Sequence, residues 1–374
     1  MRIGINATSL NNRPSGARQR FVGLYGELFR AHPEHDYVIY EPSDCRVARW
    51  FAGMPNVRGV ATPLPSERRW LRFARGIGVW RRLLARDRLD CFEALHLPLI
   101  RAPNCPTILT IHDARPVLGT VPLVRRTLYR YILRRSMRRA DAIITVSDTM
   151  RAALLRLEPS ARVVTIYNGI DPAPFAISEF VGGQKNNIFI LAVGHFEPRK
   201  NYDTLVRAFA LMAAPADALR LVIVGQDGGD LESIRLLVNA LGLADNVSLL
   251  QDVGDAQLIG LYRAASILVF PSIYEGFGIP VLEAMAANLP MALSNMPVFR
   301  ELTEDCAAYF DPLDADAMAR VLLEVLSAPE RQADQRAYGR RRLADFTFST
   351  LADQLAALHR RTIAQTDTTS GYRH

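Results

Sequence analysis

The chain has 374 residues, of which 49% are hydrophobic and 22% are charged. This composition is typical of a globular protein and excludes a disordered or fibrous one, and the length favours two domains over a single compact core. The formal net charge is +7, and it is carried almost wholly by arginine, because Lys185 and Lys200 are the only lysines. A basic surface attracts nucleic acid, anionic lipid or phosphorylated ligands, and charge alone does not distinguish among them.

The four cysteines are scattered without C-x-x-C spacing, which indicates neither a disulfide framework nor a zinc site. We therefore expect a reducing, cytoplasmic location. The first residues, MRIGINATSL, have no basic region followed by a long apolar stretch, and no segment approaches 18 uninterrupted apolar residues. The sequence predicts neither secretion nor a membrane-spanning helix.

Short apolar runs rich in β-branched residues alternate with longer helical patterns along the chain. In the first half the predicted strands are 2–6, 37–40, 107–111, 142–146 and 163–166. In the second half they are 188–193, 221–224, 247–250 and 266–270. Because such alternation is typical of parallel α/β sheets, we predict two doubly wound, Rossmann-like domains in tandem.

Turn-forming residues cluster at 168–185, where neither helical nor strand periodicity persists, so we predict the hinge there. The first domain is expected at 1–172 and the second at 173–347, and a last helical stretch near 348–364 is a candidate to cross back to the first. Doubly wound sheets bind ligands outside the carboxyl ends of their strands. Two such domains facing each other would form a site in the cleft between them.

The strongest motif is YEGFGIPVLEAMA at 274–286, directly after a predicted strand. Gly276 and Gly278 allow a ligand to approach the backbone, and the helix start offers unpaired amides to an anion. Glu275 precedes the glycines, and Glu283 in the helix is able to accept hydrogen bonds from two vicinal hydroxyls, such as those of a ribose. The plain alternative is a strand, a turn and a helix with solvated acids.

A second motif, GHFEPRKN, occupies 194–201 after another predicted strand. Arg199 and Lys200 precede Asn201, a candidate helix cap, and cations beside a helix start form a site for a diphosphate. The alternative is a solvated basic pair in a loop. A polar pair at the end of the buried-type strand TILTIHD, His112 and Asp113, is awkward in a core and natural at a cleft; the alternative for His112 is a structural histidine.

These motifs together carry a resemblance. EGFGIPVLE resembles the E-x7-E signature of retaining family 4 glycosyltransferases with the GT-B fold. The 194–201 segment is similar to the opening of that family's second domain, Ile111-His112-Asp113 resembles its His-Asp turn, and YNGID at 167–171 resembles its hinge. NNRPSGAR at 11–18 resembles its first glycine-bearing loop. Many relatives have arginine where this chain has His195, and two glycines where it has Ser15-Gly16.

The resemblance implies a front-face transfer, in which the acceptor attacks on the side from which the diphosphate leaves. It implies a nucleotide-sugar donor, with GDP-mannose preferred and UDP-sugars as the alternative, and a glycan or lipid-linked acceptor in bacterial polysaccharide or O-antigen synthesis. Two residues are expected to be catalytic, His112 and Glu275. Eight are expected to bind the donor: Gly16, Gly194, Arg199, Lys200, Gly276, Phe277, Gly278 and Glu283.

The same resemblance implies neither a metal nor another cofactor, and we expect no nucleic acid partner. Asp314-Ala315-Asp316 matches a D-x-D metal motif, but its sequence context predicts an acidic helix start, where the helix dipole favours carboxylates. A noncatalytic nucleotide-sugar-binding subunit and a sugar-nucleotide epimerase of the same double fold remain alternatives.

A basic segment at 65–90 carries five apolar residues at helical spacing: Trp70, Phe73, Ile77, Trp80 and Leu84. Eight arginines surround them, namely Arg68, Arg69, Arg72, Arg75, Arg81, Arg82, Arg86 and Arg88. A basic amphipathic helix with tryptophans is able to lie on an anionic membrane, which would make the protein peripheral to the inner face of the cytoplasmic membrane. The alternative is an ordinary helix that packs on its sheet, and both remain open.

Overall fold

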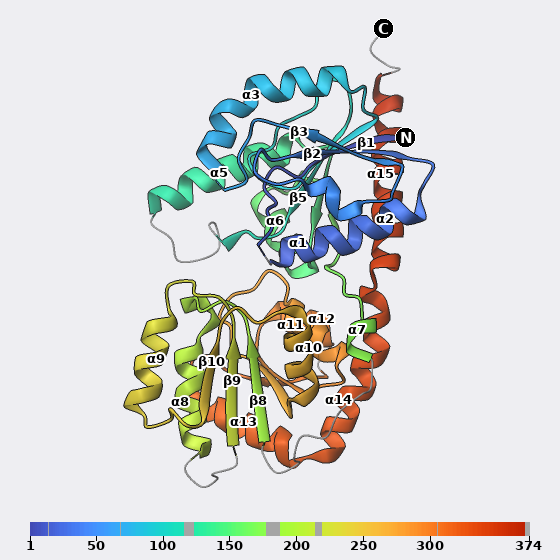
Figure 1. Ribbon diagram of the computed structural model, residues 1–374. Helices are drawn as coiled ribbons and strands as arrows, with labels where there is room; N and C mark the ends of the chain where they lie inside the picture. Colours follow the sequence, from blue (N-terminus) through green and yellow to red (C-terminus); the bar gives the residue numbers. More distant parts are fainter. Residues whose placement is uncertain are drawn as a thin grey trace. The chain divides into compact units, whose positions relative to one another are not determined.

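The computed structural model describes residues 1–13, 15–67, 69–115, 123–176, 188–213, 219–304 and 306–370 (Figure 1). The chain divides into two compact units. The first comprises Met1–Gly169 and Thr347–His374, and the second comprises Ile170–Phe346. The predicted boundary after Pro172 therefore lies three residues beyond the observed one, and the C-terminal helix belongs to the first unit.

The first unit contains a parallel sheet of seven strands in the order β3-β2-β1-β4-β5-β6-β7. The strands are β1 (Arg2–Asn6), β2 (Asp36–Glu41), β3 (Val57–Ala61), β4 (Cys91–Ala94), β5 (Thr107–Ile111), β6 (Ala142–Thr145) and β7 (Val163–Thr165). The five predicted strands of this half are confirmed, whereas β3 and β4 were not predicted. The strand order places β4 in the middle of the sheet.

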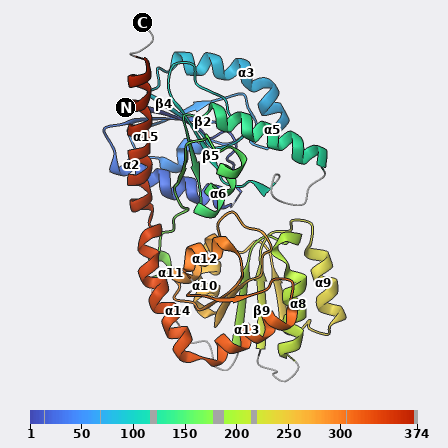
Figure 2. The ribbon, with the colours of Figure 1, turned by 180° about the vertical axis from the view of Figure 1, so that it is seen from behind.

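Helices cover both faces of this sheet, and the side chains of β2 alternate between two cores. Tyr37 and Ile39 join the core under the π-helical segment η1 (Phe21–Tyr25), which continues α1 (Gly16–Arg20), and under α2 (Gly26–Ala31) and α15 (Phe348–Ser370). Figure 2 shows α15 beside α2, which it contacts. Val38 and Tyr40 join the opposite core, under α3 (Arg69–Arg86), α5 (Leu123–Arg139) and α6 (Asp148–Leu157). A strand buried on both faces is expected in a parallel sheet.

The second unit contains a parallel sheet of six strands in the order β10-β9-β8-β11-β12-β13. The strands are β8 (Ile188–Val193), β9 (Leu219–Val224), β10 (Val247–Leu250), β11 (Ile267–Phe270), β12 (Met291–Ser294) and β13 (Ala308–Phe310). The first four confirm the predicted strands, and β12 and β13 were not predicted.

Most helices of the second unit alternate with these strands, as the predicted doubly wound pattern requires. They are α7 (Ala173–Ala176), η3 (Pro198–Lys200), α8 (Tyr202–Ala213), α9 (Leu231–Ala240), α10 (Asp255–Ala264), α11 (Ile279–Ala286), α12 (Pro297–Thr303), α13 (Ala315–Ser327), α14 (Pro329–Arg342) and η4 (Leu343–Phe346). The main core packs α8, α9 and α13 against one face of the sheet. On α12, the ring of Phe299 lies 5.0 Å from that of Phe270 on β11.

Of the two alternatives for α3, the structure favours packing on the sheet over a membrane-facing stripe at the two stripe residues whose side chains it describes. Trp80 and Leu84 are buried, and the Trp80 ring packs against Tyr40 and Phe92 with centroid distances of 5.3 and 5.6 Å. These two residues therefore belong to the core of the first unit. The side chains of three other members of the stripe, Trp70, Phe73 and Ile77, lie outside the described residues.

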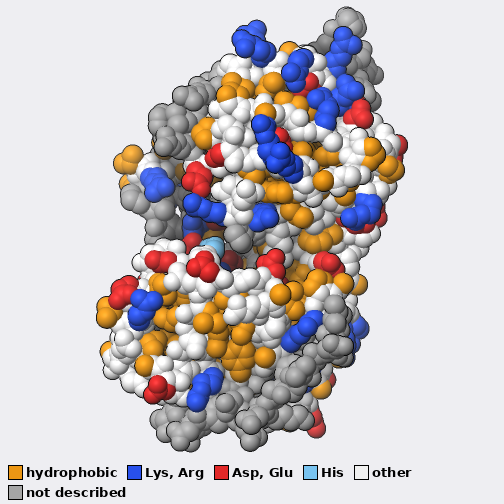
Figure 3. All heavy atoms as spheres, in the orientation of Figure 1, with side chains coloured by type: hydrophobic (Ala, Val, Ile, Leu, Met, Phe, Trp, Pro, Cys, Tyr) orange, Lys and Arg blue, Asp and Glu red, His pale blue; other side chains and the backbone are white. Residues whose placement is uncertain are grey.

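Charge differs sharply between the units. The first has 31 arginines and 15 acidic residues, a formal net charge of +16, and Figure 3 shows many of these cations on its surface. The second has 14 basic and 23 acidic residues, a net charge of −9, so that the two together give the +7 of the chain. Among the described residues, no helix is long and apolar enough to cross a membrane.

Candidate functional site

The adjacent ends of β8 and β9 each require a glycine. Gly194 has a φ of +151°, and a Cβ atom there would lie 2.8 Å from the Lys200 Nζ atom. A Cβ atom at Gly225, after β9, would lie 2.0 Å from the carbonyl oxygen of Gly194. The two strand ends approach this closely only because both residues lack side chains. The loop after β8 lies where doubly wound sheets bind ligands, at the carboxyl end of the strand.

The turn that follows holds the basic pair in place. Asn201 adopts the left-handed conformation with a φ of 58° and directly precedes α8. Its side-chain amide donates to the carbonyl oxygens of Pro271 at 3.1 Å and Pro312 at 2.6 Å. The hydrogen bonds tie the turn to the loops after β11 and β13, and so determine where Arg199 and Lys200 lie.

Glu275 brings the two sequence motifs together in one ion cluster. Its Oε1 atom lies 2.8 Å from Lys200 Nζ and 2.6 Å from Arg199 Nη1, and it accepts a hydrogen bond from Ser272 at 2.9 Å. Arg199 also donates from Nε to Glu197 at 2.7 Å. Two cations therefore meet two carboxylates. The sequence pattern placed Glu275 on the sugar and the cations on the diphosphate, and gave Glu197 no role.

The two cations of the cluster differ in their exposure to solvent. The Lys200 side chain is 7% exposed, and its ammonium lies 4.6 Å from the centre of the Phe270 ring, whereas the Arg199 side chain is 23% exposed. Burial lowers the pKa of Lys200, and Glu275 opposes that shift. Burial also opposes ionisation of Glu275, but Lys200 and Arg199 outweigh it and lower the pKa of this carboxyl. Glu275 is thus ionised at neutral pH.

The glycine loop leads into α11. Gly278 precedes the helix with a φ of +131°, which favours glycine. Glu283 on α11 is buried and accepts a hydrogen bond of 2.6 Å from the hydroxyl of Tyr262, which is itself buried. The Phe277 side chain is also buried, and its ring lies 6.2 Å from that of Phe346. The Phe277 ring is therefore part of the core, and only the backbone of Phe277 is available to a nucleotide-sugar donor.

A pocket of about 430 Å³ lies in the first unit at the end of β5. It is lined by residues of the loop after β1, of the helix that follows and of the β4 and β5 ends, including Ser9, Asn11, Arg13, Arg20, Tyr25 and His112. Gly16 begins α1 between two lining residues, Ser15 and Ala17. The predicted first loop and the predicted His-Asp turn therefore border the same pocket.

His112 is neutral in this pocket at physiological pH. Burial and, to a smaller extent, the nearby Arg20 lower the pKa of His112 to about 3, and Glu93 opposes the shift. A neutral imidazole offers one donor and one acceptor, which suits contact with hydroxyl groups. The side chain is partly buried, and its position at the end of β5 matches the sequence prediction.

Arg20 and Glu93 are buried charges that sequence reasoning missed. Arg20 donates to the backbone oxygen of Tyr167 and, at 3.1 Å, to Asn168 Oδ1. Glu93 on β4 accepts hydrogen bonds from Tyr25 and, at 2.9 Å, from Thr110, and lies 3.1 Å from the Nε2 atom of His359 on α15. The pocket floor is thus tied to the hinge sequence and to the C-terminal helix.

A π-helical segment borders the pocket. Residues 21–25 continue α1, and both Phe21 and Tyr25 line the pocket. A Cβ atom at Gly23 would meet the Phe348 ring at 2.1 Å, so this glycine is needed for α15 to pack here. Single-turn π segments inside helices are frequent at functional sites. The sequence contains no local signal that predicts one.

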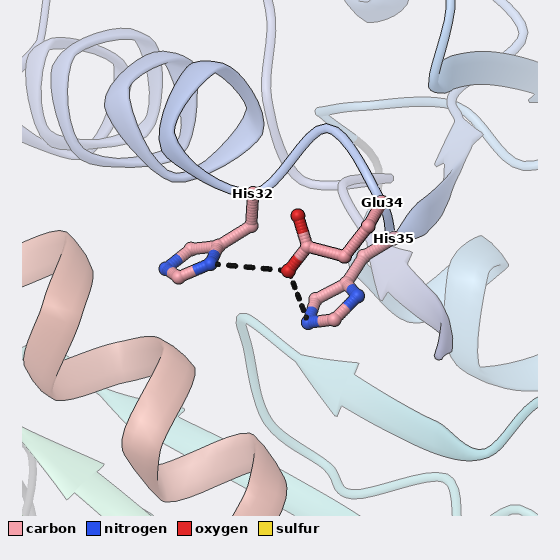
Figure 4. A group of neighbouring side chains, drawn as sticks. All are labelled: His32, Glu34 and His35. Atoms are coloured by element: carbon pink, nitrogen blue, oxygen red, sulfur yellow. Dashed lines mark ion pairs between the residues drawn. The ribbon is translucent and has the colours of Figure 1, made fainter.

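A third cluster lies away from both regions. Among the described residues, one group of histidines, cysteines and acids is close enough to hold a metal ion: His32, Glu34 and His35, between α2 and β2 (Figure 4). Glu34 Oε1 lies 3.4 Å from His32 Nδ1 and 3.4 Å from His35 Nε2. No motif predicted this cluster, and none of its members lines the pocket. It is therefore not part of the candidate site.

The D-x-D sequence is a helix start, as predicted. The Asp314 side chain accepts a hydrogen bond from the backbone N–H of Ala317 at 2.9 Å, and α13 begins at Ala315. Asp314 thereby satisfies a backbone donor that the helix cannot pair internally.

Comparison with known proteins agrees with this architecture. Residues 16–174 match the profile of Glycosyltransferase Family 4, and residues 176–342 match that of Glycosyl transferases group 1. The chain is 30% identical to the O-antigen chain mannosyltransferase RfbU of Salmonella typhimurium, over 65% of this chain and 66% of that protein, just under two thirds of its length. It is 28% identical to the phosphatidyl-myo-inositol mannosyltransferase of Mycolicibacterium smegmatis, over 96% of this chain and 93% of that one.

Solved structures share the fold. Sucrose-phosphate synthase from Thermosynechococcus elongatus superposes with a TM-score of 0.80 at 20% identity, covering 97% of this chain and 99% of that one. HepE from Anabaena, solved in complex with UDP and glucose, superposes with a TM-score of 0.72 at 16% identity, covering 96% and 99% of the two chains. The two parallel-sheet units therefore form a GT-B fold.

Proposed function

We propose that this chain, a GT-B glycosyltransferase built from a family 4 domain and a group 1 domain, transfers mannose from GDP-mannose to a glycan or lipid-linked acceptor with retention of configuration. The observation that carries the proposal is the cluster of Arg199, Lys200 and Glu275 at the carboxyl ends of β8 and β11. The named mannosyltransferases among the relatives support mannose as the sugar. Bacterial polysaccharide synthesis in the cytoplasm is the corresponding setting.

We assign the diphosphate to Arg199 first. Its guanidinium is the more exposed of the two cations, and a planar guanidinium matches phosphate oxygens in pairs. Lys200 lies beneath Gly194 and keeps Glu275 ionised and oriented. Hydrogen-bond donors that are already in position stabilise developing charge without reorganisation. Arg199 would therefore act mainly as negative charge develops on the departing diphosphate.

Glu275 and His112 are assigned to the sugar. Three hydrogen-bond donors hold one carboxylate oxygen of Glu275, so the orientation of this side chain is determined before a nucleotide sugar binds. His112, as a neutral imidazole, contacts a sugar hydroxyl without placing another positive charge beside Arg20. In the transfer, the bond from the anomeric carbon to the phosphate oxygen breaks, the acceptor oxygen bonds to the same face of that carbon, and a phosphate oxygen takes the acceptor's proton.

Glu283 is assigned to the ribose. Its carboxylate is buried and oriented by Tyr262, which suits it to accept hydrogen bonds from two vicinal hydroxyls. The backbone at Gly276, Phe277 and Gly278, together with the start of α11, would approach the donor phosphates. Gly16, at the start of the first helix, would do the same from the first unit.

We also propose that transfer needs no metal. A chelator should leave the rate unchanged, and loss of activity that manganese or magnesium restores would contradict the proposal. The cluster of His32, Glu34 and His35 provides the control for any metal effect. A metal effect that disappears in the His32→Ala/His35→Ala variant arises at that cluster rather than at the donor site.

A panel of nucleotides and nucleotide sugars tests the donor. Ligands that bind only the folded protein raise its stability by about 2.7 kcal/mol at a hundred times Kd, so thermal unfolding reports relative affinity. GDP-mannose should raise the Tm more than GDP-glucose, UDP-glucose or UDP-galactose, and should release GDP when a glycan acceptor is added. A larger shift with UDP-glucose would favour the alternative that the HepE complex suggests. Binding without transfer to any acceptor would favour a noncatalytic subunit, and conversion of the free sugar nucleotide an epimerase.

A further inference from the structure

The helix α5 exposes large apolar side chains that the fold does not cover. Leu123, Val124, Leu128 and Tyr131 are 67%, 83%, 59% and 61% exposed. Exposing apolar side chains to water costs free energy in proportion to the exposed apolar area. Four such side chains on one short helix form a patch, whereas single exposed apolar residues need no explanation.

The patch lies opposite the buried face of the helix. At 100° per residue, Leu133, Ser136 and Met137, which are buried, cluster on one side of α5. The same spacing places Val124, Leu128 and Tyr131 within one sector on the opposite side, and Leu123 at the edge between the two faces. The exposed residues are therefore not a frayed part of the core, because the helix already packs against the unit through its other face.

Arginines surround this patch. The sequence of α5, LVRRTLYRYILRRSMRR, contains seven of them and no acidic residue. Arg134 and Arg138 approach Glu158 at 3.4 and 2.7 Å, which anchors the second half of the helix to the end of α6. Arg125, Arg126, Arg130, Arg135 and Arg139 are exposed, and of these Arg135 and Arg139 lie in the same sector as Val124, Leu128 and Tyr131.

We propose that this exposed face of α5 docks the first unit on an anionic membrane surface. Leucine, valine and tyrosine side chains would enter the boundary between headgroups and acyl chains, while arginines beside them would contact lipid phosphates. The charge of the whole first unit, +16, complements such a surface, whereas the second unit is repelled by it at −9. Nucleic acid is less well matched, because phosphate contacts use the arginines and leave the apolar patch in water.

The inference rests on the proposed function only for its purpose, which is to hold the first unit beside a lipid-linked acceptor. The docking itself follows from α5 alone. It also replaces α3 as the membrane-facing element, since Trp80 and Leu84 are in the core.

Co-sedimentation of the full chain with vesicles tests the proposal. The vesicles are phosphatidylglycerol mixed equally with phosphatidylcholine, or phosphatidylcholine alone. The wild type should bind the anionic vesicles and dissociate in high salt. The variant Arg135→Glu/Arg139→Glu should bind on the order of a hundredfold more weakly, because each basic residue near the surface contributes substantially to binding.

Two further variants distinguish a docking face from general attraction. Leu128→Ser/Tyr131→Ser keeps all arginines and should still lower binding at least tenfold, with a salt dependence like that of the wild type. Arg81→Glu/Arg82→Glu reverses two exposed arginines on α3 and should lower binding far less than the α5 charge variant. Equal losses in the α3 and α5 charge variants, or unchanged binding after loss of Leu128 and Tyr131, would overturn the proposal.

A soluble acceptor separates this inference from the proposed function. All α5 variants should transfer sugar to a soluble acceptor at the wild-type rate, because α5 does not line the pocket. If the wild type binds vesicles but transfers nothing, the docking face survives and the proposed function fails. If the α5 variants lose affinity for duplex DNA while vesicle binding is unchanged, the face is a nucleic acid site and the membrane proposal is wrong.

Discussion

The two units share a parallel α/β architecture but use charge in opposite ways. In the first, arginines outnumber acids about two to one, and many are exposed on its helices. In the second, acids predominate, and the basic residues of the PRKN turn, Arg199 and Lys200, are held against Glu197 and Glu275. An exposed cation attracts partners over a distance, whereas a paired and partly buried one positions a neighbour.

Each unit also has a carboxylate that is largely shielded from water and held by several partners. Glu275 in the second unit accepts from two cations, whereas Glu93 in the first is held by Tyr25, Thr110 and His359. A buried charge is tolerated only when hydrogen bonds and opposite charges replace the water that it loses. The comparison therefore predicts that removing a partner from the buried cluster lowers the free energy of unfolding strongly, whereas removing a partner from an exposed ion pair changes it little.

The largest expected effect is on stability. Glu275→Ala leaves Lys200 buried without its carboxylate, and we expect the free energy of unfolding to fall by about 3–5 kcal/mol in urea denaturation. The matched control is Glu232→Ala, which removes an exposed carboxylate 2.7 Å from Arg235 and should lower stability by less than about 1 kcal/mol.

The pH dependence of stability in the wild type and in Glu275→Ala sharpens the comparison. The folded pKa of Glu275 lies below its unfolded value, so its contribution to stability is complete above about pH 4.3 and is lost as the pH falls through the folded pKa. The wild type should therefore lose stability more steeply in acid than Glu275→Ala does. Parallel curves for the two proteins would show that Glu275 is not stabilised by its cations.

The next effect is on turnover. Arg199→Ala should lower kcat by on the order of 10²–10³, since one positioned stabiliser of developing charge commonly contributes that much. Arg199→Ala should also weaken binding of a nucleoside diphosphate far more than binding of the nucleoside, and calorimetry would measure both affinities. His195→Ala is the control, because His195 is exposed and stands where the family resemblance leads us to expect arginine. If His195→Ala has the larger effect, the diphosphate is bound by the loop before Arg199.

A smaller effect is expected at the ribose. Glu283→Ala should weaken binding of the free nucleotide by about 1–3 kcal/mol, the range for losing hydrogen bonds to a charged group. Tyr262→Phe keeps the carboxylate and removes its 2.6 Å donor, so it should affect binding less and stability by about 1 kcal/mol. Equal losses of nucleotide affinity in both variants would mean that the Tyr262 hydrogen bond, rather than the ribose contact, accounts for the effect.

The last expected effect concerns His112 and is measured as a slope of stability against pH. Because its folded pKa of about 3 lies below the ordinary value of 6.5, the unfolded chain takes up a proton first as the pH falls, and stability decreases between these values. His112→Asn should flatten this part of the curve of unfolding free energy against pH. Activity should show no titration of His112 near pH 6.5. If the wild type and His112→Asn give the same curve of unfolding free energy against pH, the His112 side chain is exposed to water rather than buried.

Much of the architecture was predictable because it depends on local signals. Apolar runs punctuated by glycine and proline predicted nine strands, and the strand ends carried the motifs. The prediction failed at β3, an edge strand with no buried residue, at β4, CFEA, whose buried Glu93 interrupts an apolar run, and at β12 and β13, which have four and three residues. A strand is recognised from sequence only when its burial is visible in its own residues.

What the sequence determined by itself is therefore the order of elements and the position of Gly194, Arg199, Glu275 and His112 at strand ends, because hydrophobic period and turn chemistry act over a few residues. Tertiary structure decided which of these side chains meet. Lys200 reaches Glu275 across 75 residues of chain, and His359 reaches Glu93 across 266. It also decided that Trp80 is core and Leu128 surface, although both lie on arginine-rich helices. Burial depends on what packs against a face, and that partner lies elsewhere in the chain.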